Sequence, residues 1–194
     1  MIDTRTQILE RNYQAVRLNG FQGMRADKVI TELGITKGAL YHYFPNKLEL
    51  GYAIVDEIIS PAYREGWRAF EQATENHLAA LIACLEAFKH RSNEEEVKLG
   101  CPLNNLIQEM TALDGGFKAR LQAIVNQMRG SLETGLRNGQ AAGSITSTID
   151  PTQTAWFILS CLEGSYGMAK AAQSVRVFED CVNQLITYLR TLAV

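Results

Sequence analysis

Apolar residues recur every three or four positions along most of this sequence, which is the spacing of one buried helix face. The pattern predicts helices over residues 3–19, 47–70, 78–88, 102–113, 117–143 and 151–172, and a last helix that ends near residue 192. The clearest stripe carries Phe117, Leu121, Ile124, Val125, Met128, Leu132 and Leu136. Pro61 is expected to kink the helix over 47–70, because proline removes an intrahelical hydrogen bond. Residues 92–98 are expected to form a polar loop, and no segment reads as a strand. We therefore expect an all-α fold.

Residues 25–44 contain a more compact pattern, two short helices around a tight turn. Val29, Ile30 and Leu33 form the apolar face of the first helix, and Gly34 ends it. Thr36 is a suitable cap for the second helix, because its hydroxyl can accept a hydrogen bond from an exposed amide. In that helix the apolar pair Leu40 and Phe44 points inward, which leaves five residues outward: Lys37, Gly38, Ala39, Tyr41 and His42. This pattern predicts a helix-turn-helix whose second helix fits a DNA major groove.

The two predicted C-terminal helices are apolar on more than one face. The helix from 151 to 172 also carries glycine and alanine in its second half, which allows another helix to approach closely. Asp150 and Pro151 give it a cap followed by proline at the first helical position. Helices with this much apolar surface need cover on two sides. We expect them to pair with a second copy of the chain in a four-helix bundle, which gives a homodimer.

Charge and composition agree with a small head on a larger body. The chain has 194 residues, 46% of them hydrophobic, so it can bury a sizeable core. Residues 1–50 contain seven Lys/Arg and five Asp/Glu, and the remainder contains 12 and 16. The net charges of +2 and −4 suit a DNA-reading head attached to a separate body. We place the head at residues 1–46 and the effector-binding and dimerisation body at 47–194.

Few residues offer chemistry beyond binding. The four cysteines, Cys84, Cys101, Cys161 and Cys181, lack the paired spacing of a zinc site. There is no aspartate-rich metal motif, no phosphate loop and no Ser-His-Asp spacing, so we expect neither an enzyme nor a cofactor or metal. His77 and His90 are expected at the surface. The N-terminus has no apolar signal stretch, and no run of 18 apolar residues occurs. We expect a cytoplasmic protein that does not interact with membranes and whose thiols are reduced.

The N-terminal quarter resembles the TetR family of transcriptional regulators. The resemblance runs from Ile8 through Gly20 and Phe21 to the stretch Leu33-Gly34-Ile35-Thr36-Lys37-Gly38-Ala39-Leu40-Tyr41-His42-Tyr43-Phe44-Pro45-Asn46-Lys47-Leu48-Glu49-Leu50. It implies a homodimer that binds a pseudo-palindromic operator in double-stranded DNA. Such proteins usually repress transcription, and they release DNA when a small molecule enters the helical body.

The same resemblance implies roles for individual residues. Lys37, Gly38, Ala39 and His42 would face the major groove, whereas Thr36, Tyr41 and Lys47 would bind phosphates. The residue chemistry agrees, since Ala39 can touch a thymine methyl group and Lys37 can donate to guanine O6 and N7. The alternative for Tyr41 is a half-buried core position, and for His42 an uninvolved surface position.

This sequence departs from the family pattern at two places. Met24 and Arg25 stand where the family usually has a hydroxyl pair, so Arg25 is expected to replace the hydroxyl contact to phosphate by charge. Asp27 is then expected to cap the first helix of the motif. Arg11 and Asn12 stand where the family usually has two small residues, which puts a polar group at the edge of the head's core.

Candidates for an effector pocket are spread over the body. Asn104, Asn105 and Gln108 can orient a polar ligand if their helix packs inward, and the alternative is that they face solvent. Four aromatic residues are core residues or pocket walls: Trp67, Phe117, Trp156 and Tyr166. Cys101 is the best candidate for a redox-sensing thiol, because it lies at a helix start where a thiolate is favoured. The main hypothesis is a ligand-released repressor, and the alternatives are a thiol-based regulator of the same fold, an all-α enzyme, and an architectural DNA protein without a pocket.

Overall fold

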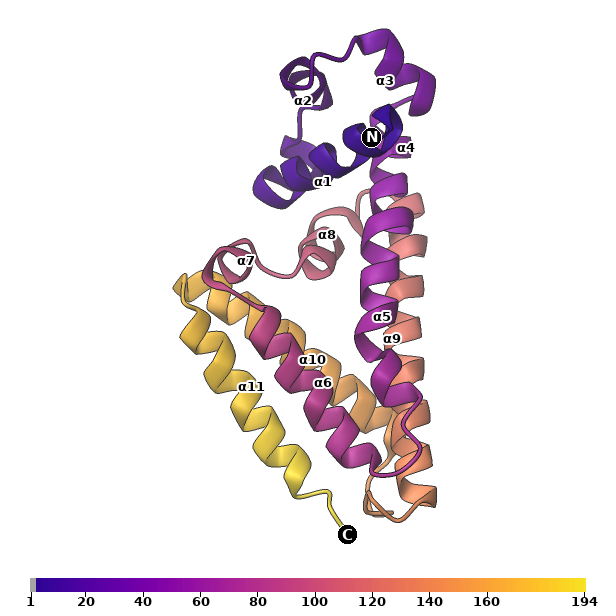
Figure 1. Cartoon of the computed structure of the whole chain (residues 1–194), viewed down its shortest axis with the longest axis vertical. Coiled ribbons are helices and arrows are strands. Elements are labelled where there is room, and N and C mark those ends of the chain that lie inside the picture. The colour runs from indigo at the N-terminus through magenta and orange to yellow at the C-terminus, as the bar shows by residue number, and fades with distance from the viewer. Residues whose placement is uncertain (1–2) are drawn as a thin grey trace. The chain divides into compact units, whose positions relative to one another are not determined.

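The computed structural model describes residues 3–194 and confirms the expected all-α fold. Within those residues there are eleven α-helices, one π-helix and no strand. The chain divides into two compact units (Figure 1). The first contains residues up to Ala62 together with Pro102–Ala123, and the second contains Tyr63–Cys101 and Ile124–Val194. The expected head at 1–46 therefore lies within a unit that also includes 47–62 and 102–123.

The first unit is formed around a helix-turn-helix. It holds α1 (Thr4–Gly23), α2 (Ala26–Glu32), α3 (Lys37–Tyr43), α4 (Lys47–Ala53), the π-helix η1 (Ile54–Ile59) and α8 (Pro102–Met110), with the start of α5 and of α9. Its core lies between α1, α4, η1 and α9, where a glycine permits close packing. A Cβ on Gly51 would collide with the rings of Phe21 and Phe117, whose centroids are 4.7 Å apart.

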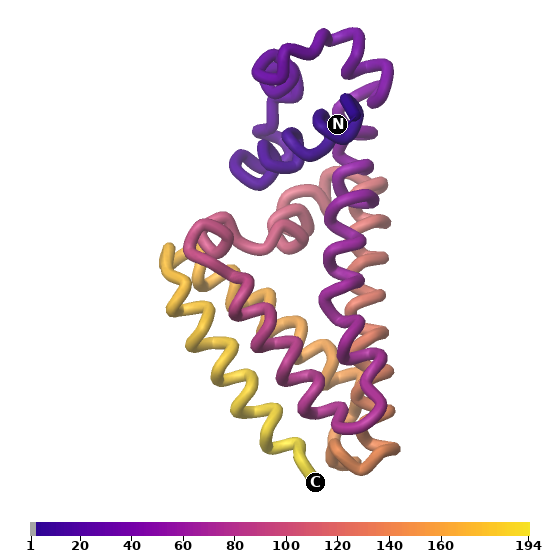
Figure 2. The backbone as a smooth tube through the Cα atoms, viewed as in Figure 1, coloured from indigo at the N-terminus to yellow at the C-terminus, as the bar shows by residue number. Residues whose placement is uncertain are grey.

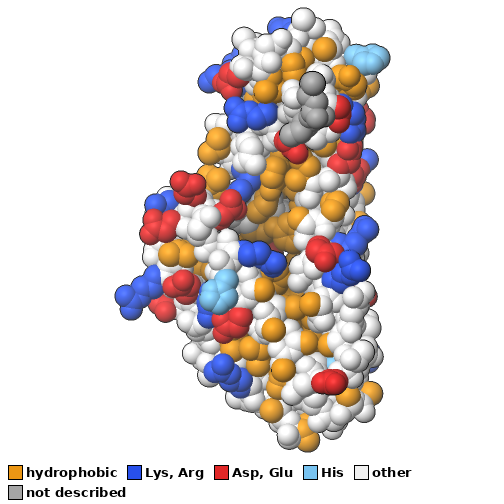
Figure 3. All heavy atoms as spheres, viewed as in Figure 1, with side chains coloured by type: hydrophobic (Ala, Val, Ile, Leu, Met, Phe, Trp, Pro, Cys, Tyr) orange, Lys and Arg blue, Asp and Glu red, His pale blue; other side chains and the backbone are white. Residues whose placement is uncertain are grey.

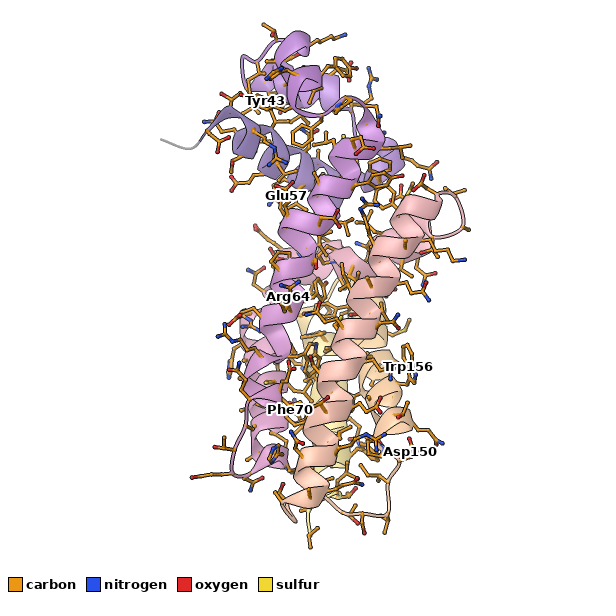
Figure 4. The ribbon with its side chains drawn as sticks, turned by 90° about the vertical axis from the view of Figure 1, so that its right-hand side faces the viewer. Tyr43, Glu57, Arg64, Phe70, Asp150 and Trp156 are labelled. Carbon is orange, nitrogen blue, oxygen red and sulfur yellow. The ribbon has the colours of Figure 1, made fainter. Side chains whose placement is uncertain are left out.

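The second unit is a set of long helices. It holds the rest of α5 (Ser60–Glu71), α6 (His77–Arg91), α7 (Glu94–Leu99), the rest of α9 (Gly115–Ala141), α10 (Pro151–Ala172) and α11 (Val175–Arg190). α10 and α11 lie side by side, and α6 packs along α11 (Figure 1). Phe70 of α5 is fully buried against α9 at Gly135, where any side chain would collide with the ring (Figure 4).

Several helix starts are capped by side chains, and those at Thr36 and Asp150 are the ones that the sequence predicts. Thr36 Oγ1 accepts from the Ala39 amide at 3.2 Å, Asn46 Oδ1 accepts from the Glu49 amide at 2.9 Å, and Asp150 Oδ1 accepts from the Gln153 amide at 2.8 Å. The expected cap at Asp27 is wrong. α2 begins at Ala26, its N-cap position is Arg25, and no side chain caps it.

Three other expectations about local structure are corrected. Residues 94–99 form α7 rather than a loop, because Asn93 Oδ1 caps the helix through the Glu96 amide at 2.9 Å. α9 begins at Gly115 instead of after a break, since Asp114 Oδ1 accepts from the Phe117 amide at 2.8 Å. His77 is buried, whereas His90 is exposed as expected.

The expected kink at Pro61 is replaced by a wider helical turn. η1 lies between α4 and α5, and the Ser60 amide donates to the carbonyl of Val55 five residues back. A π turn accommodates one extra residue, and Pro61, which has no amide proton, follows directly after it. The backbone from 47 to 71 therefore continues as one helical run (Figure 2).

Candidate nucleic-acid interface and effector site

The outer face of α3 is formed as the sequence predicts. Leu40 and Phe44 are buried and hold the helix against the first unit. Lys37, Gly38, Tyr41 and His42 are exposed, and Ala39 is half-buried. The side chain of Tyr41 is 56% exposed, which rules out the core position considered as its alternative. The surface of this part of the chain carries Lys, Arg and His side chains (Figure 3).

Tyr43 extends the same surface beyond the residues identified from the sequence. It is 39% exposed, and its ring lies edge-on to that of His42 with centroids 5.1 Å apart (Figure 4). Helical spacing did not single it out, because Tyr43 follows the inward-facing Leu40 by three positions, and residues three apart are neighbours on a helix surface. The end of α3 therefore presents three adjacent rings, Tyr41, His42 and Tyr43.

Arg25 lies at the start of α2 with its side chain in solvent. Its guanidinium is 3.4 Å from the Asp27 carboxylate, and this hydrogen bond lowers the pKa of Asp27. An exposed pair of this kind contributes little to stability, so the arginine remains available to a phosphate. Met24, the other residue that stands where the family pattern has a hydroxyl pair, is buried and has no hydroxyl to offer a phosphate.

Lys47 is held by the first unit itself. Its ammonium donates to the carbonyl oxygen of Gln22 at 3.0 Å and lies 5.1 Å above the Phe21 ring. Partial burial lowers the pKa of this lysine. A role in phosphate binding stays a prediction, and it requires the ammonium to exchange the Gln22 carbonyl for a phosphate oxygen.

The pocket candidates are divided between the two units. Asn104, Asn105, Gln108 and Phe117 belong to the first unit, and Trp67, Cys101, Trp156 and Tyr166 to the second. Gln108 is exposed, whereas Asn104 and Asn105 are half-buried. Phe117 and Trp67 are core residues, Phe117 against Phe21 and Trp67 against the Phe88 ring with centroids 5.0 Å apart.

Cys101 and Tyr166 do lie in one polar cluster of the second unit, which we call the thiol cluster: Tyr63, Ser92, Cys101, Glu163 and Tyr166. The Tyr63 hydroxyl is 2.8 Å from the buried Cys101 sulfur, and the Cys101 side chain also hydrogen-bonds Glu163. The hydroxyls of Tyr166 and Ser92 are 2.9 Å apart.

Burial dominates the electrostatics of the thiol cluster. It raises the pKa of Tyr166 to about 12 and raises the pKa of Glu163, which the Cys101 hydrogen bond partly offsets. The cluster therefore favours neutral, proton-bearing groups. It suits a small ligand with hydrogen-bonding groups, or a reaction at the sulfur.

Sequence reasoning missed three members of the thiol cluster, Tyr63, Ser92 and Glu163. They come from α5, the residue after α6, and α10. Glu163 had a detectable signal, since it is the only acidic residue inside the otherwise apolar helix from 151 to 172. Tyr63 and Ser92 had none, because only the packing of the second unit places Tyr63 beside Cys101 and Ser92 beside Tyr166.

Two other cysteines, Cys84 and Cys161, have thiols with raised pKa values. Cys84 is buried, which raises the pKa of its thiol. Burial also raises the pKa of Cys161. Between residues 3 and 194, no set of three or more His, Cys, Asp or Glu side chains is placed to bind a metal ion. Over the same residues, no helix has the length and apolar character needed to cross a bilayer.

The outer side of α10 exposes large apolar residues. Trp156, labelled in Figure 4, is 44% exposed. Phe157 is 46% exposed and Met168 60%, and a Cβ on Gly164 or Gly167 would meet nothing within 4 Å. The Arg129 guanidinium lies 5.7 Å from the Trp156 ring. Monomeric proteins seldom leave such a row uncovered.

A helix-turn-helix with a solvent-facing second helix, attached to a separate helical body, defines a DNA-binding regulatory protein. The chain belongs to the TetR family of bacterial transcriptional regulators, because the model of the tetracyclin repressor-like C-terminal domain matches residues 77–185. The model for bacterial regulatory proteins of the tetR family matches residues 8–54. The resemblance found in the sequence is thus confirmed, and the families matched are regulators and not enzymes, as expected.

Individual relatives agree with this assignment. An uncharacterised HTH-type transcriptional regulator of Lactococcus lactis is 24% identical over 95% of this chain and 92% of its own length. The transcriptional regulator AcuR of Cereibacter sphaeroides is 29% identical over 78% of this chain and 69% of its own length. The HTH-type transcriptional repressor NemR of Escherichia coli is 21% identical over 99% and 96%.

Solved structures share the fold. The crystal structure of E. coli NemR in its reduced form has a TM-score of 0.83 at 22% identity and covers 100% of this chain and 99% of that one. A TetR transcriptional regulator from Chloroflexus aurantiacus has a TM-score of 0.85 at 22% identity, over 98% and 96%.

Proposed function

We propose that this regulator is a repressor that binds a palindromic operator as a homodimer and is released by a small-molecule effector. The observation that supports this most directly is the outer face of α3, where Lys37, Gly38 and His42 are exposed on a helix anchored by Leu40 and Phe44. A helix with small and basic outer residues can lie deep in a major groove and donate to base edges.

The exposed row on α10 supports the dimer. A two-fold axis would place the row of one chain against that of the other and cover both. The recognition helices of such a dimer would lie about one DNA turn, roughly 34–36 Å, apart. An effector lowers DNA affinity only by as much as it favours a conformation in which this spacing is wrong.

The test is binding to the DNA directly upstream of the chain's own gene, measured over a range of salt concentrations. Specific binding with a steep salt dependence, weakened by Lys37→Ala and unchanged in Glu95→Gln, supports the proposal. Glu95 is an exposed residue of α7 and serves as the control. If the wild-type protein binds upstream and unrelated DNA equally weakly, the proposal is wrong.

A thiol-based regulator is the second candidate, and the environment of Cys101 favours it. Its sulfur lies 2.8 Å from the Tyr63 hydroxyl, and its side chain also hydrogen-bonds Glu163. With hydrogen peroxide, the sulfur would attack one peroxide oxygen and the O–O bond would break. The departing hydroxide would take up the thiol proton, so that a sulfenic acid and one water molecule form. The relative NemR has a crystal structure named as a reduced form, which is in keeping with this candidate.

The two candidates separate on one substitution. Cys101→Ser should abolish any loss of DNA binding caused by hydrogen peroxide, whereas Cys84→Ser, a change of another buried thiol, should not. An unchanged peroxide response in Cys101→Ser would eliminate the thiol-based candidate and leave the ligand-released repressor.

A further inference from the structure

The last turn of α1 is bent away from the rest of the helix at Gly20. This glycine has φ 73° and ψ 169°, so the helical hydrogen bonding is interrupted there. The Met24 amide still bonds the Gly20 carbonyl at 3.0 Å, which closes Gly20–Gly23 into a separate turn. A helical turn that begins anew leaves its first amides without carbonyl partners. In this turn those amides belong to Phe21 and Gln22.

Glu109, near the end of α8, accepts both of these amides. Its Oε2 lies 2.8 Å from the Phe21 nitrogen and its Oε1 lies 2.7 Å from the Gln22 nitrogen. A Cβ on Gly20 would be 2.9 Å from Oε2, so the carboxylate would have to shift if this residue carried a side chain, and the φ of 73° itself favours glycine. Two charge-assisted hydrogen bonds from one carboxylate fix both position and orientation.

The same turn is held from its other side. The Lys47 ammonium of α4 donates to the Gln22 carbonyl at 3.0 Å, and the Phe21 ring packs against Gly51 of α4. Gln22 is therefore bonded at its amide by α8 and at its carbonyl by α4. Two residues further on, Met24 is buried, and α2 begins at Ala26. The position of the turn thus affects both the start of the helix-turn-helix and the first residue of α4.

α8 joins this turn to the thiol cluster without any intervening loop. Cys101 is the last residue of the second unit, and α8 starts at the next residue, Pro102. From Pro102 to Glu109 the helix rises by about 10 Å. A helix of two turns moves as a rigid piece, so a displacement of its first residue reaches its last.

We propose that Glu109 is the residue through which α8 controls the Gly20–Gly23 turn, so that a change at Cys101 alters DNA affinity through these two hydrogen bonds. This inference rests on the proposed function as a DNA-binding regulator. Glu109 acts as a positioning residue, since its carboxylate holds the backbone of the turn that precedes the helix-turn-helix.

The first test measures the two hydrogen bonds from the Phe21 and Gln22 amides to Glu109, by amide hydrogen exchange in the full-length protein. Glu109→Gln keeps the side-chain size but has only one acceptor oxygen. We expect exchange at the Phe21 and Gln22 amides to accelerate about 10- to 100-fold, as for the loss of a hydrogen bond to a charged group. Glu95→Gln makes the same charge change on the exposed face of α7 and should leave both rates unchanged. Equal rates in Glu109→Gln and wild type would overturn the proposal.

The second test measures transmission to DNA, and it needs no effector. Cys101→Phe forces a large side chain into the buried position directly before α8 and so displaces that helix. We expect it to weaken binding to the upstream DNA at least about tenfold in the wild-type background and less than about threefold in the Glu109→Gln background. Equal losses in both backgrounds, or no loss in either, would overturn the proposal.

The outcomes separate the inference from the function on which it rests. If the wild-type protein does not bind its upstream DNA, the proposed function is contradicted. The hydrogen-exchange measurement then still tests whether Glu109 holds the Phe21 and Gln22 amides. If Cys101→Phe does not fold, Cys101→Leu provides a smaller displacement, and the same comparison of backgrounds applies. If the wild-type protein binds its upstream DNA, but the Cys101 substitution weakens binding equally in the wild-type and Glu109→Gln backgrounds, only the inference about Glu109 is contradicted.

Discussion

Replacing Gly164 by alanine distinguishes a free α10 face from one that is covered by a second chain. Gly164 lies inside α10, is exposed, and has room for a Cβ, because nothing in the chain comes within 4 Å of that position. Glycine in a helix interior is about 1 kcal/mol less favourable than alanine. For the isolated chain, Gly164→Ala should therefore increase the free energy of unfolding by about 1 kcal/mol. This corresponds to a rise of about 2–4 °C in Tm for a protein of this size.

If a second chain covers this face of α10, Gly164→Ala should destabilise the dimer instead of stabilising the chain. Two-fold symmetry brings two new methyl groups into one interface, where an overpacked contact costs about 1–3 kcal/mol each. The combined cost of about 2–6 kcal/mol should weaken the dimer at least about 30-fold. Gly130→Ala is the matched control, since Gly130 lies inside α9, also has open space around it, and is not on α10.

The assay combines sedimentation equilibrium with thermal unfolding at low and high protein concentration. We expect Gly130→Ala to raise Tm and leave the dissociation constant unchanged, and Gly164→Ala to raise the dissociation constant. If Gly164→Ala raises Tm as much as the control does and association is unaltered, the reasoning that places the dimer interface on α10 is refuted.

Three further predictions concern the head and the thiol cluster. Asn12→Leu should stabilise the protein by about 1–2 kcal/mol in urea unfolding, because the Asn12 amide is fully buried and its Oδ1 has no hydrogen-bond partner within residues 3–194; a lower urea midpoint would contradict this. Lys37→Ala should cost about 1–3 kcal/mol of DNA binding and relax the preference for guanine at one operator position; an equal loss on all sequences would assign Lys37 to phosphate instead. The pKa of Tyr166 is raised to about 12, so above about pH 10 the folded state keeps this proton while the unfolded state loses it. The free energy of unfolding should therefore fall as pH rises from about 10 to about 12, by up to about 1.4 kcal/mol per pH unit. Tyr166→Phe should remove this contribution to the pH dependence of stability. If the urea midpoint changes equally between about pH 9 and about pH 11 in the wild-type protein and in Tyr166→Phe, Tyr166 makes no such contribution.

Local signals in the sequence predicted those parts of the fold that local physics determines. The side chains of Thr36 and Asp150 cap helices where expected, because a cap needs only an amide two or three residues away. The inward pair Leu40 and Phe44 followed from helical spacing alone. Residues 94–99 were misjudged because their charged sequence hides a cap at Asn93, which is as good as the others.

The candidate site was only partly predictable, because its contacts link distant parts of the sequence. Cys101 was identified from its own position, but Tyr63 is 38 residues away from it. Glu109 was not identified at all, since its partners lie 88 and 87 residues away and are backbone amides. A backbone partner leaves no side-chain pattern in the sequence, so only the fold reveals such a contact.

The π turn at Ile54–Ile59 changes which residues of the helical run from 47 to 71 face the core. Leu50 and Ile59 are both buried in the first unit, although they are nine residues apart. At about 100° per residue, an uninterrupted α-helix would place them on opposite sides. The extra residue in the wide turn resets the angular phase, so that two apolar stripes of different register share one core. A one-residue deletion within 54–59 would change the phase of everything that follows, whereas a conservative substitution there would not. In this segment the number of residues therefore matters more than their identity.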